Sequence, residues 1–360
     1  MSDAPLQLDT LAQGAQRVED VGAALASWIA QTRRTLDVAL YSVHIPGPVG
    51  DRVFAAVRDA SVRGVAVRAL VHRPDVEPTA LHATAAPRTR VDTLRRAGVH
   101  IELTEQVRDL MHHKFVVRDD AAVWTGSTNW TLDDFGAEEN VIVRVDSRAI
   151  ADAYSAVFAE LWATRQIDGT GDHEPAFHPV GDAQVRPWFC PGRGRALSHR
   201  MADRVTTARR RVRVASPIIT AGPVLSALSV AARGRADVSG IVDISQTARV
   251  LGQWNEGVPT WKGPVLEQVL LECGFAGKAS SEDYGRPGSV RDTMHAKVLV
   301  ADDAAFVGSF NLSRSGEANA ENVLEIEDAA IADRLAAWID ELRLRYPPAA
   351  TVLADGDAPA

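Results

Sequence analysis

Two stretches of the chain repeat the same set of chemically capable side chains. Each contains Met-His-x-Lys, a short β-branched run, an Asp pair and Gly-Ser-x-Asn, at 111–129 (MHHKFVVRDDAAVWTGSTN) and 294–311 (MHAKVLVADDAAFVGSFN). The second copy is one residue shorter between the Asp pair and the Gly. The repeated side chains are His112, Lys114, Asp119, Ser127 and Asn129 in the first copy and His295, Lys297, Asp302, Ser309 and Asn311 in the second.

The spacing of His and Lys places two nitrogen groups side by side. Positions i and i+2 of a strand point to the same face, so each motif sets an imidazole beside an ammonium group. A single His-x-Lys is as often a pair of solvated surface residues, but its recurrence half a chain length away indicates a duplicated unit. Glu139-Asn140-Val141 recurs in the same way as Glu321-Asn322-Val323, which supports two equivalent halves.

Paired motifs of this kind suit the cleavage of a phosphodiester. Such a bond resists attack because its negative charge repels the nucleophile and the leaving alkoxide is a poor anion. Two facing motifs would supply a neutral imidazole to attack phosphorus, an imidazolium to protonate the departing oxygen, and two ammonium groups over the phosphate. The Ser and Asn side chains of both motifs would add hydrogen-bond partners for the substrate.

A nucleophilic histidine also needs an acceptor, usually a carboxylate, that keeps its second ring nitrogen protonated. Glu139 and Glu321 follow the two motif histidines at nearly equal distances, and we assign them as these orienting groups. The alternative for both is a carboxylate that opens an exposed strand. Asp119 and Asp302 belong to the repeated catalytic set, but Asp is also favoured in turns, and support of the turn after the strand is their alternative role.

The pattern His-x-Lys-x4-Asp followed by Gly-Ser-x-Asn resembles the HKD signature of the phospholipase D superfamily, in the form with both motifs on one polypeptide. The resemblance implies an α/β fold of two pseudo-symmetric α/β/α halves, each a mixed sheet flanked by helices, packed around one shared active site. It also implies a covalent phosphohistidine, resolved by water or an alcohol, with no metal and no other cofactor. By analogy, His112 is expected as the nucleophile and His295 as the general acid, although the motif sequences themselves do not decide the order.

Helices alternate with strands on both sides of the midpoint, which is typical of α/β units. Apolar spacing predicts helices near 16–34, 147–165, 263–273 and 330–343, strands near 35–45, 64–72, 212–219 and 238–244, and a loop at 251–264. We expect a first half at 1–168, a linker rich in Gly, Pro and Asp at 169–194, a second half at 195–346 and a flexible tail at 347–360.

Composition limits the cellular setting. The chain has 360 residues, of which 46% are hydrophobic and 24% charged, as in ordinary soluble proteins. The N-terminus lacks a secretory pattern, and the uncharged stretch 214–232 contains Pro and Gly that favour a strand, a turn and a helix over a membrane span. Cys190 and Cys273 show no metal or redox spacing. We therefore expect a cytoplasmic monomer with at most a peripheral association with membranes.

The motifs define a phosphodiester substrate and leave the groups on either side of it open. The loop at 251–264, with Trp254 and Trp261, would suit a lipid interface, and its alternative is an ordinary surface loop. A nucleic acid requires a basic stripe, and the densest basic run, 209–213 (RRRVR), has the alternative of solvated arginines at a helix end. The net charge of −8 favours a phospholipid. A nuclease that cuts DNA or RNA is the alternative, and two intact motifs argue against a catalytically silent scaffold.

Overall fold

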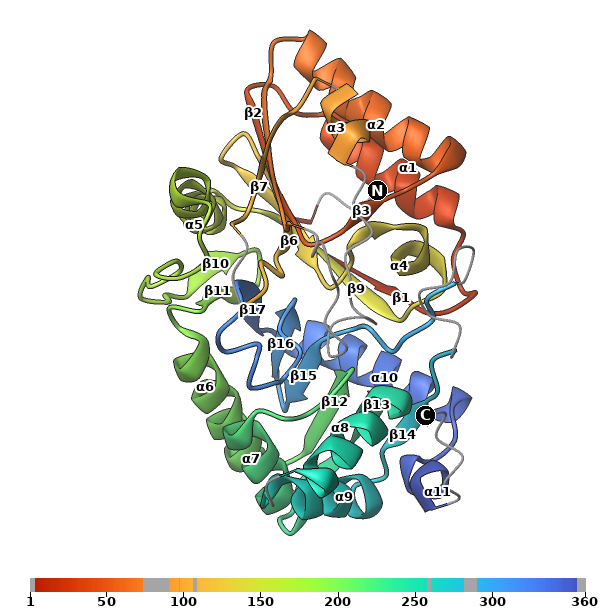
Figure 1. Cartoon of the computed structure of the whole chain (residues 1–360). Coiled ribbons are helices and arrows are strands. Elements are labelled where there is room, and N and C mark those ends of the chain that lie inside the picture. Colours follow the sequence, from red (N-terminus) through yellow and green to blue (C-terminus); the bar gives the residue numbers. More distant parts are fainter. Residues whose placement is uncertain are drawn as a thin grey trace.

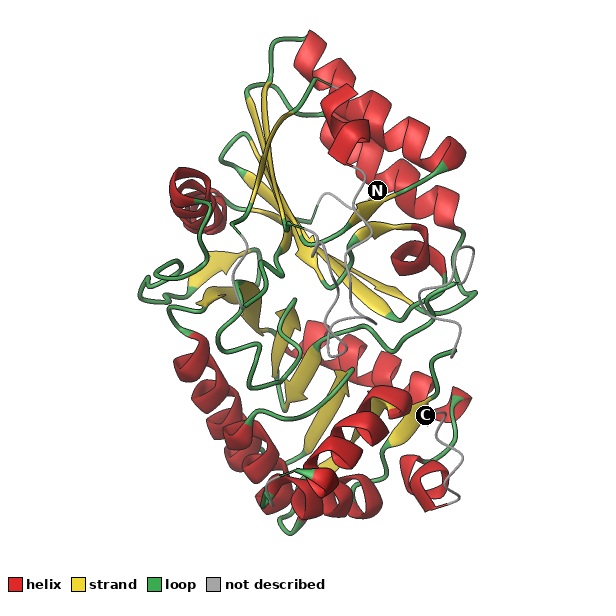
Figure 2. Cartoon of the chain, in the orientation of Figure 1, coloured by secondary structure: helices red, strands yellow, loops and turns green. Residues whose placement is uncertain are grey.

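The computed structural model describes residues 4–73, 91–96, 98–105, 109–257, 260–281 and 290–354. The chain forms two halves, each built on one large sheet (Figures 1 and 2). The first half runs from red to yellow in Figure 1, and the second from green to blue. The two halves face one another, and the long chain segment between the two motifs crosses from one to the other.

The first sheet has seven strands in the order β1-β9-β7-β6-β2-β4-β5. The pairs β2/β4 and β4/β5 are parallel and the other pairs are antiparallel, so the sheet is mixed, as expected. Its strands are β1 (Leu6–Leu11), β2 (Thr35–Leu40), β4 (Ala66–Val71), β5 (His100–Leu103), β6 (Lys114–Arg118), β7 (Ala122–Gly126) and β9 (Asn140–Asp146). A short parallel pair, β3 (Val43–His44) and β8 (Trp130–Thr131), lies apart from it.

The second sheet has eight strands in the order β10-β11-β17-β16-β15-β12-β13-β14. Apart from β10, this order repeats that of the first sheet, with β11 in the place of β1. Its strands are β10 (His178–Val180), β11 (Ala183–Cys190), β12 (Arg211–Ser216), β13 (Asp237–Asp243), β14 (Ala276–Lys278), β15 (Val298–Ala301), β16 (Ala304–Gly308) and β17 (Glu321–Glu327). The repeated strand order confirms the prediction of two pseudo-symmetric α/β halves.

Helices cover both faces of each sheet. In the first half they are α1 (Val18–Ala30), α2 (Gly47–Val62), α3 (Val91–Arg96), α4 (Leu132–Gly136) and α5 (Arg148–Thr164). In the second half they are α6 (Gly194–Thr207), α7 (Gly222–Ala232), α8 (Ile244–Glu256), α9 (Lys262–Glu272), α10 (Ala329–Arg345) and α11 (Ala349–Ala354). The pair α1 and α2 covers the outer face of the first sheet, and α6, α7 and α9 cover that of the second (Figure 1).

A single apolar cluster joins the two halves. Helix α5 contributes Tyr154 and Phe158 to it and α10 contributes Leu335 and Ile339, all fully buried. Strand β6 alternates as a pleated strand must: Phe115 and Val117 face this shared cluster, while Val116 faces the outer helices of the first half. Because α5 also touches β11 and α10 touches β1, the halves are packed as one body. The shared cluster therefore fixes the position of one motif relative to the other.

Three segments differ from the sequence-based expectation. Residues 169–194, expected as a linker, contain β10 and β11, and both strands belong to the second sheet. The stretch 251–264, expected as a loop, begins as the last turns of α8, whose first turn is capped by the Asp243 carboxylate accepting from the backbone N–H of Gln246 at 2.9 Å. In the expected tail, α11 packs through the fully buried Ala349, while 355–360 lie outside the described residues.

Candidate active site

The motif histidines lie immediately before the central strands, not on them. Lys114 is the first residue of β6, and Lys297 directly precedes β15. In both copies the lysine side chain forms a hydrogen bond with the backbone of the motif histidine. The Lys114 Nζ donates to the carbonyl oxygen of His112 at 2.7 Å, and the Lys297 Nζ donates to that of His295. The structure therefore keeps imidazole and ammonium adjacent in an extended segment that leads into the strand.

Each motif is joined to the backbone of the opposite half. The N–H of His112 donates to the carbonyl of Ala320 at 2.9 Å, and the N–H of His295 donates to that of Glu139 at 3.2 Å. Isolated parallel bridges between Met111 and Ala320 and between Met294 and Glu139 continue this pairing. The two motifs, far apart in sequence, are thus held at one junction between the sheets.

The imidazole of His112 is oriented by a carboxylate from the second half. Its Nδ1 lies 2.9 Å and 3.0 Å from the two carboxylate oxygens of Glu321. His112 is 6% exposed and Glu321 is fully buried. Because the partner is an acceptor, Nδ1 carries the proton and Nε2 keeps the lone pair in the neutral ring. The assignment of Glu321 as an orienting group fits this geometry, with the histidine of the other half as its partner.

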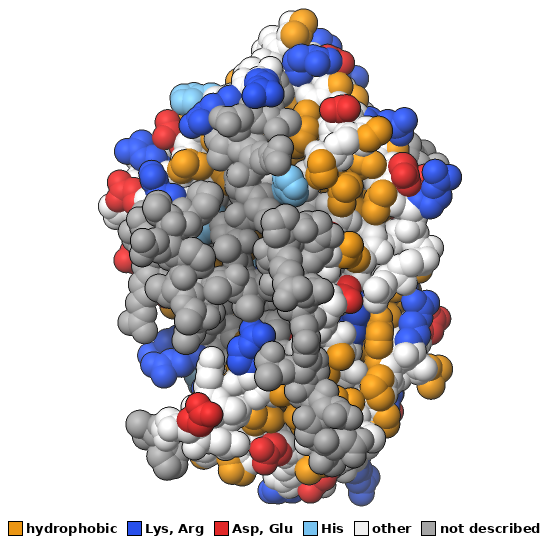
Figure 3. Space-filling model, turned by 45° about the vertical axis from the view of Figure 1, so that its right-hand side comes forward, with side chains coloured by type: hydrophobic (Ala, Val, Ile, Leu, Met, Phe, Trp, Pro, Cys, Tyr) orange, Lys and Arg blue, Asp and Glu red, His pale blue; other side chains and the backbone are white. Residues whose placement is uncertain are grey.

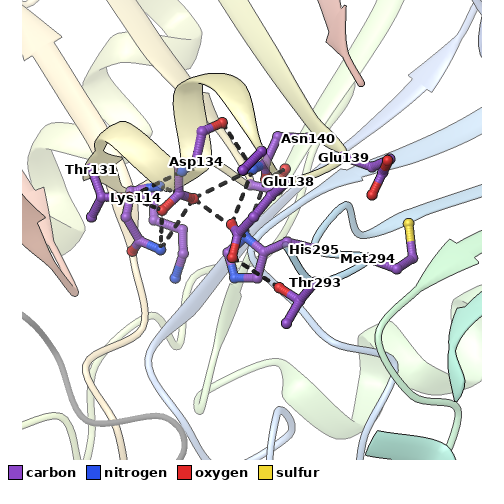
Figure 4. Close-up of polar contacts among 12 residues, drawn as sticks. Lys114, Thr131, Asp134, Glu138, Glu139, Asn140, Thr293, Met294 and His295 are labelled. Carbon is purple, nitrogen blue, oxygen red and sulfur yellow. Dashed lines mark hydrogen bonds and ion pairs between the residues drawn. The ribbon is translucent and has the colours of Figure 1, made fainter. Parts of the chain in front are cut away.

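The imidazole of His295 lies among three acceptors from the first half (Figure 4). Its Nδ1 is 3.1 Å from Asn140 Oδ1, 3.2 Å from Glu138 Oε2 and 3.3 Å from Asp134 Oδ1. Each of these acceptors is held by other donors: Asp134 accepts from the Thr131 hydroxyl at 2.6 Å, and Glu138 from the Thr293 hydroxyl at 2.8 Å. The two motif histidines therefore have different surroundings, an asymmetry that the motif sequences did not contain.

Glu139 does not orient either histidine, so that part of the assignment is wrong. Its side chain points away from His295 in Figure 4. It forms a buried ion pair with Lys278 at 2.6 Å and accepts a hydrogen bond from the Tyr346 hydroxyl at 2.5 Å. Lys278 and Tyr346 both belong to the second half. Glu139 is therefore a structural anchor between the halves.

A one-residue shift in strand register explains the error. Gly126 pairs with Ile142, whereas the matching Gly308 pairs with Val323. Counted from these pairs, Asn140 occupies the position of Glu321, although the repeated Glu-Asn-Val sequence aligns Glu321 with Glu139. The first half thus places an amide where the second places a carboxylate, and Glu138 and Asp134 supply the negative charge.

Asp119 and Asp302 lie at the far ends of the motif strands, away from the histidines. Both have left-handed backbone conformations, with φ of 57° and 52°. The Asp119 carboxylate accepts from the backbone N–H groups of residues 33–35, and the Asp302 carboxylate from those of residues 209–211. Burial raises the pKa of both carboxyls, but these N–H donors outweigh it and lower the pKa below the ordinary value. The turn-supporting alternative applies, and the catalytic assignment of both residues is wrong.

Replacing Asp302 by alanine is expected to lower the free energy of unfolding by roughly 1–3 kcal/mol, because three N–H groups lose their acceptor and alanine is strained at positive φ. Urea unfolding measures the loss. Asp302→Asn, which tolerates this conformation and retains an acceptor oxygen, serves as the matched control. Turnover per folded molecule should stay within about twofold, because no reacting group is touched. A collapse of turnover with unchanged stability would contradict the structural role.

Three of the motif Ser and Asn residues, Ser127, Ser309 and Asn129, form hydrogen bonds with residues that neighbour the histidines or their acceptors. The Ser127 hydroxyl donates to Asn140 Oδ1 at 2.6 Å, and the Ser309 hydroxyl accepts from the Asn322 N–H at 3.0 Å. The Asn129 amide group donates to the Asp134 carboxylate at 3.2 Å, so it is not a free donor for phosphate. Within the described part of the chain, Asn129 and Asn311 each retain a buried Oδ1 without a hydrogen-bond partner.

Burial sets the protonation of the nitrogen groups. It lowers the pKa of His112 and His295 well below the ordinary value, and the nearby lysine charges lower it further. Burial likewise lowers the pKa of Lys114 well below its usual range and that of Lys297 to about 7. The charge of each lysine lowers the pKa of both motif histidines, which is a further sign that the two motifs share one site.

The three carboxylates of the site titrate differently. Burial raises the pKa of Glu321 to about 7, against the opposing charge of Lys114. Burial and the charge of Asp134 raise the pKa of Glu138 well above its ordinary value. Burial also opposes ionisation of Asp134, but hydrogen bonds from His295, Thr131 and Asn129 lower its pKa overall. We therefore expect a charged Asp134 and a neutral Glu138 beside His295 at neutral pH.

Two aromatic residues near His112, Tyr41 and His72, were not predicted from the sequence. The ring of Tyr41 lies 4.9 Å from that of His112 and 5.1 Å from that of His72, and the Lys114 ammonium lies 5.1 Å from the Tyr41 ring centre. The N–H of Met111 donates to His72 Nδ1 at 3.3 Å. Tyr41 and His72 directly follow the parallel strands β2 and β4. The carboxyl ends of adjacent parallel strands are a usual place for functional residues, and this signal was available in the sequence.

Asp134, Glu138 and His295 could also be considered as metal ligands. Each offers one ligand atom, and these atoms lie within 4.8 Å of one another, an arrangement that no other His, Cys, Asp or Glu residues in the described part of the chain share. Their oxygens already accept hydrogen bonds from Thr131, Asn129 and Thr293, which a metal ion would have to displace. The donor set therefore fits a hydrogen-bonded network around an imidazole better than a coordination sphere.

Three of the four arginines in the basic run at 209–213 form ion pairs. Arg210 pairs with Asp303, Arg211 with Asp333, and Arg213 with Asp237 and Asp340. Among the described residues on the face drawn in Figure 3, Lys and Arg side chains lie scattered between acidic and apolar ones. Most of the positive charge of this run is thus paired with carboxylates, which leaves little of it for a phosphate backbone. No helix within the described ranges is long and apolar enough to cross a bilayer.

A family model described as "Cardiolipin synthase, PLD-like domain" matches residues 25–162 and 201–343. The two matched segments lie one in each half, and each contains one complete motif. Together they cover well over half of the chain.

Curated relatives match shorter segments. The chain is 38% identical over 96 residues to a mitochondrial cardiolipin hydrolase of Xenopus laevis, covering 26% of this chain and 45% of that protein. It is 30% identical over 134 residues to a phospholipase D of Rickettsia bellii, covering 36% and 60%. The chain thus spans about half the length of the curated relatives that it matches.

Two solved structures share the fold across most of the chain. Phosphatidylserine synthase of Haemophilus influenzae superposes with a TM-score of 0.61 at 14% identity, covering 94% of this chain and 86% of that one. Polyphosphate kinase of Porphyromonas gingivalis gives 0.57 at 12% identity, covering 94% and 47%. At such identities the likeness concerns the fold alone.

Proposed function

Because the chain belongs to the family of cardiolipin synthase PLD-like domains, we propose that it is a phosphodiesterase of phospholipase D type that hydrolyses or transfers a phosphatidyl group. One observation carries the proposal. Each motif histidine has its Nδ1 held by acceptors of the opposite half, Glu321 for His112 and the Asp134 group for His295. This arrangement fixes both imidazoles in the tautomer that chemistry at Nε2 requires.

The proposed reaction has two displacements at phosphorus. In the first, Nε2 of neutral His112 forms a P–N bond, the P–O bond to the leaving group breaks, and His295 gives that oxygen its proton. In the second, His295 takes a proton from water or an alcohol, the new oxygen bonds to phosphorus, and the P–N bond breaks. Lys114 and Lys297 carry positive charge toward the non-bridging oxygens, so the proposed chemistry requires no metal.

The unequal surroundings of the histidines support the order of roles. A general acid must become an imidazolium, and His295 has the charged Asp134 carboxylate, Glu138 and the Asn140 oxygen around its Nδ1. His112 has one carboxylate, Glu321, at its Nδ1, which suits a neutral ring whose Nε2 lone pair is made more nucleophilic. Burial lowers the pKa of His295 in the free enzyme, and the negative charge of a bound phosphodiester would oppose this lowering and favour the imidazolium form. We therefore assign His112 as the nucleophile and His295 as the acid.

A phospholipid is the favoured substrate, and its hydrolysis is the direct test. The enzyme in EDTA is expected to release head group from vesicles of phosphatidylglycerol and phosphatidylcholine and to leave single-stranded DNA intact, because its densest basic run is already paired with carboxylates. Thin-layer chromatography of lipid and gel analysis of DNA, run side by side, give the comparison. Cleavage of DNA alone would replace the lipid assignment by a nuclease, and loss of lipid turnover on chelation would overturn metal independence.

The pH dependence of kcat/KM is expected to be bell-shaped around neutrality. As pH falls through the Glu321 pKa of about 7, its carboxylate is protonated and polarises His112 less. As pH rises through the Lys297 pKa of about 7, a cation over the phosphate is lost. Glu321→Gln should flatten the acid limb at a reduced rate, and Lys297→Arg should move the alkaline limb upward, because arginine stays charged. A profile that is flat from acid to alkaline pH would contradict these assignments.

A further inference from the structure

A second cluster of cations lies outside the set of residues around the two histidines. A cavity of about 240 Å³ in the second half is lined by Arg195, His199, Gly222, Lys262, Arg314 and Glu317, among others. The lining contains two arginines, one lysine and one glutamate. In a chain with a net charge of −8, such a local excess of positive charge needs an explanation.

The cations of this cavity differ from the other arginines of the same helix. Arg200 and Arg204 of α6 pair with Glu325 and Glu327. Within the described ranges, by contrast, the side chains of Arg195 and Arg314 make no ion pair or hydrogen bond. Lys262 donates to the carbonyl of Thr220 at 2.7 Å, and the charge of the nearby Glu317 offsets that of Lys262 only in part. Burial and the nearby Arg314 charge lower the Lys262 pKa, so gathering these groups has an electrostatic cost that a bound anion would relieve.

Three helices begin at this cavity and add to its positive potential. Arg195 is the second residue of α6, Gly222 the first of α7 and Lys262 the first of α9, and these helices have 14, 11 and 11 residues. None of the three has an acidic residue in its first turn or a side-chain cap. The partial positive charge at such helix N-termini favours a bound anion such as phosphate.

An exposed tryptophan stands at the edge of the cavity. Trp261 precedes Lys262 and is 52% exposed. Its ring faces the start of α7, where a Cβ built on Gly222 would lie 3.5 Å from it. Tryptophan beside cationic groups is typical of surfaces that rest in the head-group region of a bilayer. Trp254, the other tryptophan of the expected loop, is instead partly buried against the core of the second half.

The loop at 312–319 connects this cavity to the proposed active site. It starts after Asn311, and the carbonyl of Leu312 accepts from the N–H groups of Thr220 and Ala221 at 3.0 and 2.8 Å, just before α7. It ends at Asn319, whose amide donates to Glu321 at 3.4 Å. An anion held at Arg314 would therefore sit on the same loop that leads to the partner of His112.

We propose that this cavity binds the head-group phosphate of an anionic phospholipid, with Trp261 in the bilayer interface, and so docks the protein on a membrane. The proposal goes beyond the cleavage reaction and does not depend on it, because none of the cavity residues belongs to the histidine cluster. A phosphodiester of this lipid need not be the one that is cleaved.

Vesicle flotation with the full chain carrying His112→Ala tests the proposal without turnover. Vesicles of phosphatidylcholine with about one third phosphatidylglycerol should bind it, and the charge reversals Arg195→Glu and Arg314→Glu together should weaken binding roughly tenfold or more. The matched control is Arg233→Glu with Arg235→Glu, the same change of charge at the other end of α7, which should alter binding less than about twofold. Equal binding by the two double variants, both folded by circular dichroism, would overturn the site.

Two further experiments distinguish a lipid head group from a free phosphate compound or a nucleic acid as the ligand of the cavity. Trp261→Ser should weaken vesicle binding and leave calorimetric binding of glycerol phosphate unchanged, because only the bilayer contact is lost. The Arg195→Glu, Arg314→Glu variant should lose both. If this variant instead lost binding to a single-stranded oligonucleotide and kept vesicle binding, the lipid assignment would be overturned. A failure of the proposed chemistry at His112 would alter none of these results, so the two proposals are tested separately.

Discussion

The His295→Ala enzyme is expected to turn over natural lipid at least ~10⁴-fold more slowly than the wild type, yet to accumulate a phosphatidyl group on His112 when the leaving group is p-nitrophenol. This phenol departs as a stable anion and needs no acid, so the P–N bond can still form. The second displacement lacks its base without His295, so the adduct persists. Intact mass spectrometry followed by peptide mapping measures the adduct and its position.

The His112→Ala enzyme is the necessary counterpart. It should lose a similar factor of turnover with both leaving groups and form no adduct, because the nucleophile itself is missing. His100→Ala, an exposed histidine at the edge of the first sheet, controls for chemical modification of histidines in general. An adduct on His295 in the His112→Ala enzyme would reverse the two roles, and the absence of any adduct in either variant would contradict a covalent route.

Two glutamates that look equivalent in the sequence are expected to behave in opposite ways. Glu321→Gln should lower kcat/KM by roughly 10²–10⁴-fold with little loss of stability. The amide can still accept a hydrogen bond from Nδ1 of His112, but it lacks the negative charge that makes the imidazole more nucleophilic. Glu139→Gln should leave turnover per folded molecule nearly intact but lower the free energy of unfolding by about 3–5 kcal/mol, because Lys278 is left buried without its counter-charge.

Steady-state kinetics and urea unfolding of both variants, prepared in parallel, separate the two effects. Replacing Lys278 by methionine together with Glu139→Gln removes the buried charge as well and should recover part of the stability. Equal loss of activity in the two single variants would restore the symmetric assignment that the repeated Glu-Asn-Val sequence suggests. It would also show that the strand register, which makes Asn140 the equivalent of Glu321, does not decide which residue orients His295.

Much of the architecture could be predicted because it depends on local and repeated patterns. The duplicated motifs fixed the two halves, and the apolar spacing located most helices and strands within a few residues. Strand β1, with the sequence LQLDTL, and strand β11 were missed. Both pair with a later strand, β9 and β17, and such pairings are set by contacts distant in sequence.

The site residues that escaped prediction did so for a similar reason. Asp134 and Glu138 come from a segment of the first half whose counterpart in the second half has neither carboxylate in the same place, so the repeat gave no signal for them. Glu139 was misassigned because identity of sequence was taken as identity of position. Ser127 accepts from the N–H of Val141 and Ser309 from that of Asn322, so Asn140 is the structural equivalent of Glu321. Which acceptor meets which imidazole is decided by how the halves pack.

The central claim is that His112 and His295 act on one phosphorus at the junction of the halves. A crystal structure of the enzyme with orthovanadate, which mimics the five-coordinate phosphorus of the displacement, tests it most directly. The account predicts one vanadium per chain, bonded to Nε2 of His112, with an oxygen about 3 Å from Nε2 of His295. Two vanadate ions, each held by one histidine in a pocket of its own, would contradict it.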